Sequence, residues 1–383
     1  MSAVPLTLLG STWDHDRGYL PLAATARAWA RLAGGQVRIV WQRRTLQEFA
    51  DYPLDRLARD FDLVVMDHPA VGLAAATRAL VPLEDLVPAE LLADLSTHTG
   101  PSYESYVYGG HLWALPVDAA VQVSAYRPDL MSRLPASWDE VLDLARERHE
   151  GPRVAMPLIP VDALCSFLSL AANRGDAPMA GEGLWDHDVG VKALAWLRAL
   201  VPHLHPCSLA ADPPGVLELM ARTDEIAYVP LIFGYANYAR SHYRPHRIAF
   251  AAIPSHERGP VGALLGGAGL AISRRCADLE AAAGYAAWVA SPAVQRGLYA
   301  SAGGQPAHLH AWLDPAVNAL TDGFFAATLA TLESSFTRPR HPGFLAFQDT
   351  AGRALHDFLV RGGDPDALVR NLEAMYAASG PDR

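Results

Sequence analysis

Short apolar runs alternate with longer amphipathic segments along the first part of the chain. Residues 5–9, 36–41 and 61–66 are rich in apolar side chains and have the length expected for buried strands. Residues 21–32 lie between the first two runs, read as a helix, and are followed by Gly34, a residue typical of helix ends. This alternation of strands and helices predicts a parallel, doubly wound sheet.

A second pattern begins at the Gly109-Gly110 turn. Residues 111–115 read as a short strand, and Pro116 is expected to end it, because proline cannot donate a hydrogen bond to a neighbouring strand. Residues 117–126 resume as a strand in which apolar and polar side chains alternate with a period of two. We therefore expect the chain to leave one structural unit here and to enter another.

The later part of the chain repeats these signals. Ser137 and Glu140 have the spacing of a capping box, in which two side chains satisfy free amides at a helix start. Residues 247–254 form a short strand that ends in Ile-Pro, which we interpret as the second crossing between units. A glycine-bearing strand at 263–273 and an alanine-rich helix at 278–290 follow.

Two groups of motifs resemble a known family. The first comprises Leu115-Pro-Val-Asp118, the strand that ends in Tyr-Arg-Pro-Asp-Leu130, and Pro135-Ala-Ser-Trp-Asp-Glu140. The second comprises the glycine strand, the alanine-rich helix, Ser291-Pro-Ala-Val-Gln295 and Gly304-Gln-Pro306. Together they resemble family 1 extracellular solute-binding proteins, the substrate-capture components of ABC importers, many of which bind sugars. The resemblance extends over nearly the whole chain.

The resemblance implies a type II periplasmic-binding-protein-like fold of the α/β class. Such a fold has two domains, each a mixed sheet flanked by helices, with hinge strands between them and a ligand in the interdomain cleft. A chain of 383 residues and 41.2 kDa is also too long for one ordinary core. We expect a first domain at 1–117 plus 252–310 and a second at 118–251 plus 311–383.

The charge balance narrows the choice of partner. The chain carries 41 acidic and 31 basic residues, a formal net charge of −10, and its single lysine is Lys192. Such a surface disfavours polyanions, so nucleic acid is not an expected partner. No window approaches the roughly 20 apolar residues of a membrane span, so we expect no membrane insertion.

The N-terminus and the cysteines bear on the compartment. Residues 1–16 lack the basic segment and the longer apolar run of a secretory signal. We therefore predict a cytoplasmic protein if Met1 is native, and a periplasmic one if a signal peptide has been trimmed. Cys165, Cys207 and Cys276 are odd in number and widely spaced, which favours buried free thiols over a disulfide framework.

The first candidate binding loop follows the first strand, where ligands bind in open α/β sheets. Trp13 could stack on a sugar or an aromatic group, and Arg17 offers a planar fork suited to a carboxylate or phosphate. His15 could donate to such an anion, while Asp14 stands beside it. The structural alternative is a solvated turn in which Arg17 pairs with Asp14 or Asp16.

The second candidate loop contains Asp67 and His68, after the third strand. Because strands one and three are neighbours in a doubly wound sheet, His15 and His68 could lie close together. We expect a hydrogen-bonding pair there rather than a metal site, since no single element carries metal-ligand spacing. No cofactor is predicted.

Three further groups complete the candidate site. Gly267 and Gly269 lie inside a predicted strand, where glycine often marks the close approach of a ligand or of another backbone. Asp118 stands at the first crossing, and we assign it to the second domain. The second domain also contributes aromatic side chains in polar or glycine-containing surroundings: Trp185, Phe233 and Tyr235.

No motif for catalysis is present. The chain lacks GxSxG, HExxH and Walker A sequences. We therefore expect a binding protein that captures a small polar ligand, either sugar-like or bearing a carboxylate or phosphate, as a monomer and with an ABC transporter permease as partner. The alternatives are a cytoplasmic enzyme that uses carboxylates and histidines of the same cleft, and a sensor that closes on its ligand.

Overall fold

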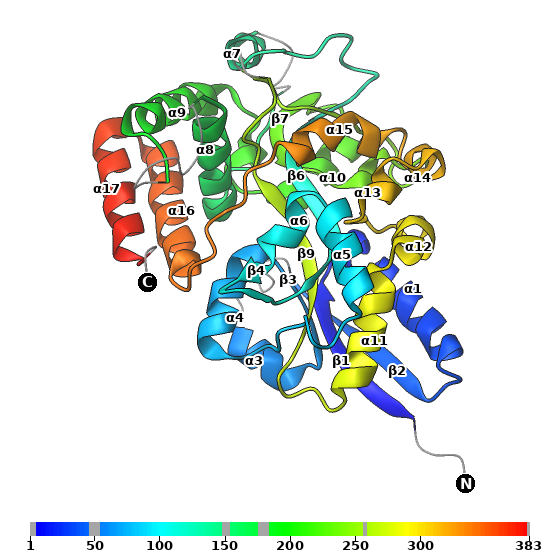
Figure 1. Cartoon of the computed structure of the whole chain (residues 1–383). Coiled ribbons are helices and arrows are strands. Elements are labelled where there is room, and N and C mark those ends of the chain that lie inside the picture. The colour runs from blue at the N-terminus through cyan, green and yellow to red at the C-terminus, as the bar shows by residue number, and fades with distance from the viewer. Residues whose placement is uncertain (1–4, 46–53, 148–153, 175–183, 256–258, 381–383) are drawn as a thin grey trace. The chain divides into compact units, whose positions relative to one another are not determined.

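The chain forms two compact units, each built from stretches that are not contiguous in the sequence. The computed structural model describes residues 5–45, 54–147, 154–174, 184–255 and 259–380. The first unit comprises Met1–Ala120, Gly266–Leu320 and Arg340–Pro342, and the second comprises Val121–Leu265, Thr321–Pro339 and Gly343–Arg383 (Figure 1).

A mixed sheet forms the centre of the first unit. Strand β1 (Leu6–Trp13) pairs in parallel with β2 (Val37–Arg44) on one side and with β3 (Leu63–Met66) on the other. Strand β9 (Leu265–Ile272) pairs with β3 in the antiparallel direction. The three predicted N-terminal strands and the adjacency of strands one and three are confirmed. All four residues of β3 are buried, as a strand covered on both faces requires.

Helices and one hairpin surround this sheet. They are α1 (Asp16–Leu32), α3 (Leu54–Asp60), η1 (His68–Ala70), α4 (Val71–Thr77), α5 (Ala89–His98), α6 (Pro101–Ser105), β4 (Val107–Tyr108), β5 (His111–Leu112), α11 (Leu279–Ala290), α12 (Pro292–Val294), the π-helical turn η5 (Gln295–Tyr299), α13 (Leu309–Trp312) and α14 (Pro315–Leu320).

The turn between β1 and α1 is shorter than the sequence suggested. The sequence predicts a strand over 5–9 and a helix over 21–32, whereas β1 continues to Trp13 and α1 begins at Asp16. The helix can begin early because the side chain of His15 caps its N-terminus. The polar residues of this segment therefore belong to a tight strand-to-helix junction.

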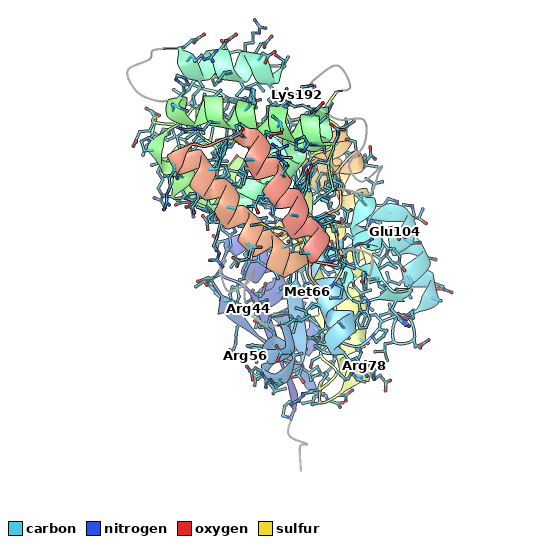
Figure 2. The ribbon with its side chains drawn as sticks, turned by 90° about the vertical axis from the view of Figure 1, so that its left-hand side faces the viewer. Arg44, Arg56, Met66, Arg78, Glu104 and Lys192 are labelled. Atoms are coloured by element: carbon cyan, nitrogen blue, oxygen red, sulfur yellow. The ribbon has the colours of Figure 1, made fainter. Side chains whose placement is uncertain are left out.

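Charged side chains of the first unit separate into buried and exposed groups. Arg44 at the end of β2 is buried, and its Nη2 donates to the carbonyl oxygen of Val65 at 2.7 Å. Arg56 and Arg78 are exposed (Figure 2). Arg44 thus links β2 to β3 from the end of its strand.

The Gly109-Gly110 turn is present, but Pro116 does not end a strand. Both glycines have positive φ angles, 60° and 80°, as the two central residues of a tight hairpin turn between β4 and β5 require. Strand β6 (Leu115–Tyr126) includes Pro116. A proline is tolerated there because it stands near the strand start, and pairing to residues 305–306 begins only at Asp118.

The second unit contains the remainder of β6 and two antiparallel partners, β7 (Tyr228–Phe233) and β8 (Ala249–Ala251). Its helices are α7 (Trp138–Arg146), α8 (Pro160–Arg174), α9 (His187–Leu200), η2 (Val201–His203), η3 (Pro206–Leu209), α10 (Pro213–Arg222), η4 (Ala236–Ala239), α15 (Phe324–Glu333), α16 (Phe344–Arg361) and α17 (Pro365–Ala378). The capping box at the start of α7 is confirmed in part: Ser137 Oγ accepts from the amide of Glu140, whose carboxylate accepts from the amide of Ala136.

The second crossing occurs later than the sequence analysis placed it. Residues 252–265 belong to the second unit, where Asn173 Nδ2 donates to the carbonyl oxygen of Val261 at 2.9 Å. The amide of Leu264 donates to Ser169 Oγ at 3.0 Å. These bonds to α8 hold the segment in place, so the chain enters the first unit at β9 and leaves it after Leu320.

Gly267 and Gly269 allow backbone and side chains to approach β9 closely. Gly267 has a φ of 114°, and a Cβ at this position would overlap the carbonyl oxygen of Asp118. A Cβ at Gly269 would lie 2.7 Å from atoms of Ala114 and Tyr106. The sequence suggested that these glycines allow the close approach of a ligand or of another backbone. The geometry supports the close approach of other parts of the chain.

We predict that Gly267→Ala lowers the free energy of unfolding by at least about 2 kcal/mol, because it combines a disfavoured φ with a steric overlap. The matched control is Gly284→Ala inside α11, where the nearest atoms lie 3.6 Å from the added carbon. This control is expected to stabilise by about 0.5–1 kcal/mol through helix propensity. Urea unfolding of both variants measures the effect, and similar stabilities would contradict it.

Candidate functional site

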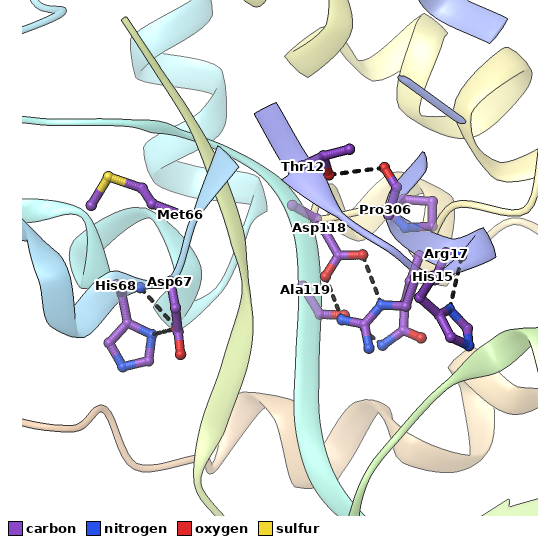
Figure 3. A network of polar contacts seen from close by, with 12 residues as sticks. Thr12, His15, Arg17, Met66, Asp67, His68, Asp118, Ala119 and Pro306 are labelled. Carbon is purple, nitrogen blue, oxygen red and sulfur yellow. Dashed lines mark hydrogen bonds and ion pairs between the residues drawn. The ribbon is translucent and has the colours of Figure 1, made fainter. Parts of the chain in front are cut away.

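A buried ion pair stands at the carboxyl end of β1. Arg17 in the first turn of α1 donates from Nε to Asp118 Oδ2 at 2.8 Å and from Nη2 to Asp118 Oδ1 (Figure 3). The side chains are 4% and 0% exposed. The arrangement is a bidentate pair, the geometry in which guanidinium binds carboxylate most strongly.

The backbone of β6 is held firmly at this point. The amide of Ala119 donates to the carbonyl oxygen of Gln305 at 3.2 Å, and Gln305 Nε2 donates to the carbonyl oxygen of Ala119 at 2.8 Å. Gly267 lies against the carbonyl of Asp118 from β9. Residues from four separate parts of the sequence therefore position one carboxylate.

Opposing interactions act on the pKa of Asp118. Burial raises the pKa of Asp118, and the negative charge of Asp67 adds to this shift, although the charge and hydrogen bonds of Arg17 act against it. Burial likewise raises the pKa of the Tyr299 phenol, together with the charge of Asp118. Arg17 is thus the group that favours a charged Asp118 in this interior.

The neighbours of Arg17 have other partners than those expected. His15 Nδ1 accepts from the amide of Arg17 at 3.0 Å and so acts as the helix cap. Asp14 pairs with Arg43 at 3.0 Å on the surface. The structural alternative for Arg17, a solvated turn in which it pairs with Asp14 or Asp16, is wrong, because the guanidinium turns into the interior, toward Asp118.

Asp67 and His68 form a second polar group, after β3. Asp67 Oδ1 accepts from the amide of His68 at 2.8 Å and lies 3.1 Å from His68 Nδ1. The imidazole is buried and packs edge-on against Tyr106 at a centroid distance of 6.5 Å. His15 and His68 stand on opposite sides of Figure 3, so their expected proximity is wrong. Each ring is directed to its own local partner.

Trp13 is not an open stacking surface. Its ring belongs to the buried core of the first unit, and a Cβ at Gly18 would overlap it. The indole therefore fills the space between β1 and the first turn of α1. The predicted role in stacking on a ligand is not supported, because a ring packed against its own backbone offers no free face.

The aromatic candidates lie in the second unit, whereas Asp118 lies in the first and not, as expected, in the second. Trp185 packs edge-on against Phe167 at a centroid distance of 4.9 Å. Phe233 is half-buried at the end of β7, and Tyr235 is buried just before η4. The structure therefore gathers Arg17, Asp67 and Asp118 in one unit and leaves the aromatic group in the other.

Comparison with known proteins now bears on identity. The family model for bacterial extracellular solute-binding protein matches residues 56–325. The chain belongs to this family. A probable ABC transporter-binding protein of Deinococcus radiodurans is 21% identical to this solute-binding protein, over 97% of this chain and 93% of that one.

Solved structures show the same fold. The maltose-bound MalE3 of T. maritima aligns with a TM-score of 0.84 and 18% identity, over 97% of this chain and all of that one. A solute-binding protein of Agrobacterium radiobacter K84 in complex with ribitol aligns with a TM-score of 0.80 and 20% identity, over 97% and 98% of the two chains. One from Thermotoga lettingae bound with α-D-tagatose gives 0.81 and 16%, over 98% and 99%. The predicted fold class is confirmed.

His205 and Cys207 lie close together in the sequence, and each has local surroundings that involve no ligand. His205 Nδ1 accepts from the amide of Cys207 at 3.2 Å, so this histidine caps η3. Burial, with the charge of Glu225, raises the pKa of the Cys207 thiol to about 11. A protonated thiol is a poor metal ligand.

Across the described ranges, no helix has both the length and the apolar character needed to span a membrane.

Sequence reasoning missed a cluster of one carboxylate and three imidazoles in the first unit. Asp94 and His98 on α5 meet His308, which stands 214 residues from Asp94 in the sequence. His310 packs its ring against both histidines. The i, i+4 spacing of Asp94 and His98 and the His-Leu-His triplet were the available signals, but neither indicates the other.

We predict that Arg17→Met lowers the free energy of unfolding of this solute-binding protein by about 3–5 kcal/mol, because it leaves the buried Asp118 without its partner. The double variant Arg17→Met/Asp118→Leu should recover most of that loss. Arg59→Ala, which breaks an exposed pair with Asp55, serves as control and should cost about 0.3–0.5 kcal/mol. Urea unfolding at neutral pH checks all three. Equal losses for Arg17→Met and Arg59→Ala would be inconsistent with this role.

Proposed function

We propose that this solute-binding protein reversibly captures a small, neutral, hydroxyl-rich ligand such as a sugar or polyol at the carboxyl ends of β1 and β3. The bidentate Arg17–Asp118 pair is the observation that carries this proposal. The guanidinium that had suggested an anionic ligand is neutralised by a carboxylate of its own chain.

The charges near this edge favour hydroxyl groups over anions. The buried guanidinium groups of Arg17 and Arg44 contribute two positive charges, while Asp118 and Asp67 contribute two carboxylates close enough to influence each other. His15 directs a lone pair, not a proton, toward the amide of Arg17. A carboxylate or phosphate would meet no surplus of positive charge, whereas ligand hydroxyls can donate to carboxylate oxygens. Asp67, with a side chain 31% exposed, is the acceptor we assign to this role.

The ligands of related folds support the same class. MalE3 is described with maltose, the Agrobacterium protein with ribitol and the Thermotoga protein with tagatose. All three are uncharged polyhydroxylated molecules. We carry this class, and no particular sugar, to the present chain.

Binding without chemical conversion is the second part of the proposal. A glycosidase needs two opposed acids, one of them able to give up a proton. Asp118 is buried and holds Arg17 with both oxygens, which ties it to a structural role. The family and the related structures are binding proteins, which supports capture over the enzyme alternative.

We also propose that the protein acts as a monomer that delivers its ligand to an ABC transporter permease. The Deinococcus relative described as a transporter-binding protein supports this partner. The family is described as extracellular. For this chain the compartment stays a prediction: cytoplasm if Met1 is native, periplasm if a signal peptide is removed. Fractionation of the source cells distinguishes the two, and size-exclusion chromatography tests the monomer.

We expect neutral sugars or polyols, but not sugar acids or sugar phosphates of the same size, to raise the melting temperature of the full-length protein. A ligand that binds only the folded state stabilises it by mass action. Chromatography of the recovered ligand should show it unchanged. Stabilisation by the anionic series alone would refute the ligand class, and conversion to a product would refute the binding role.

Asp67→Asn should weaken the affinity for the neutral ligand found in that screen by about 1–3 kcal/mol, because a charged acceptor is replaced by an amide. Asp55→Asn, on the exposed surface of α3, is the matched control and should leave affinity unchanged. Titration calorimetry measures both. If Asp67→Asn binds as tightly as the unmodified protein, Asp67 has no part in recognition.

A further inference from the structure

A compact group of metal-binding side chain types lies in the first unit, apart from the residues assigned to ligand capture. It is formed where the C-terminal end of α5 meets the start of α13. Asp94, His98 and His308 each place one ligand-type atom within 4.8 Å of the other two. His310 lies beside them, with its ring centroid 4.6 Å from that of His98 and 4.8 Å from that of His308.

The carboxylate of Asp94 joins the group. Its Oδ2 lies 2.9 Å from His308 Nε2, and its Oδ1 lies 2.9 Å from His98 Nδ1. Two imidazoles from distant parts of the chain therefore point at one carboxylate. Their rings are stacked at a centroid distance of 5.6 Å, with an interplanar angle of 21°.

This combination is typical of first-row transition metal sites. Imidazole nitrogen and carboxylate oxygen bind zinc at roughly 2.0–2.2 Å, so atoms within 4.8 Å of one another need only modest side-chain rotation to surround one ion. Asp94 and His98 are one helical turn apart and so share a face of α5. His308 is fully buried and already held in position, which limits the entropy lost on binding.

We propose that Asp94, His98 and His308 bind a divalent transition metal ion, Zn²⁺ or an ion of similar chemistry. The ion would join α5 to the segment before α13. Hard cations such as Mg²⁺ and Ca²⁺ are not the expected occupants, because they prefer sets of oxygen ligands.

The hydrogen bonds indicate which nitrogens would bind. His98 Nδ1 faces the Asp94 carboxylate, so this nitrogen would bind the ion, and the proton that it can share with the carbonyl oxygen of Asp94 at 3.1 Å would move to Nε2. His308 Nδ1 accepts from the amide of His310 at 3.2 Å. Coordination through His308 Nε2 moves its proton to Nδ1 and gives up this cap. With an ion bound, the first turn of the four-residue helix α13 would be held through the bond from His308 to the ion and no longer through this hydrogen bond.

A second histidine–carboxylate group shows why close approach alone does not suffice. His187 in the second unit lies 2.9 Å from Asp366 through Nε2 and 3.1 Å from Glu373 through Nδ1. The two carboxylates thus face opposite nitrogens of one ring and cannot share an ion with it. His187 is therefore a matched control: a half-buried histidine between carboxylates without convergent ligands.

The experiment uses the full-length protein after treatment with a chelator and its removal. Titration calorimetry with Zn²⁺ is expected to show one ion bound per chain, and differential scanning fluorimetry a rise in melting temperature that EDTA reverses. Mg²⁺ and Ca²⁺ at the same concentrations should produce neither effect. Absence of Zn²⁺ binding in the unmodified protein would overturn the proposal.

Variants assign the ion to this cluster. Asp94→Asn and His98→Gln should each weaken Zn²⁺ binding by at least about tenfold and reduce the thermal shift. His187→Gln should leave both unchanged. Far-UV circular dichroism establishes that each variant is folded. The two cluster variants remove different ligands, so each tests the site independently of the other. If Zn²⁺ affinity is the same in all three variants, or falls only in His187→Gln, the site lies elsewhere. The solute-binding assay is independent of these outcomes.

Discussion

One buried charge pair constrains several parts of the first unit. Removing a guanidinium and a carboxylate from water costs several kcal/mol each, and only close, bidentate contact repays that cost. The requirement explains several features at once. The cap by His15 starts α1 early enough to aim Arg17 inward, and Gln305 holds the β6 backbone beside Asp118. Gly267 has no side chain because the carbonyl of Asp118 occupies that space.

The same pair changes what the unit can recognise. An arginine after the first strand of an α/β sheet normally indicates an anion site, because backbone amides and guanidinium attract negative charge together. Here the anion is supplied by the protein. In the function we propose, the polar edge with the partly exposed Asp67 takes the ligand, and its carboxylate can accept from hydroxyl groups.

The two histidine groups of the first unit differ in how their protons are used. His15 and His68 are each satisfied by a residue within two positions in the sequence, one as a helix cap and one beside Asp67. His98 and His308 instead converge on one carboxylate from segments far apart in the chain. Local satisfaction fixes a backbone turn, whereas convergence creates a set of donor atoms. The second arrangement is the one we propose as an ion site.

The sequence by itself determined the elements and the class of fold. Periodicity and capping signals depend on neighbouring residues, so the three N-terminal strands, the Gly109-Gly110 turn and the start of α7 were predictable. The order of strands and helices, with the motifs around Asp118, was enough for the family. Segment ends were less predictable: the passage of β6 through Pro116 and the second crossing at β9 depend on bonds to distant partners.

Tertiary structure alone decided which side chains meet. Composition marked Trp13, Arg17 and Asp118 as candidates, but the fold packs the indole against Gly18, and a partner 101 residues away neutralises the arginine. The Asp94–His308 contact spans 214 residues and has no local signal at all. Short-range patterns are encoded by neighbours in the sequence, whereas a site forms where folding brings distant segments together. Charge and chemistry at such a site are therefore set by the fold as a whole.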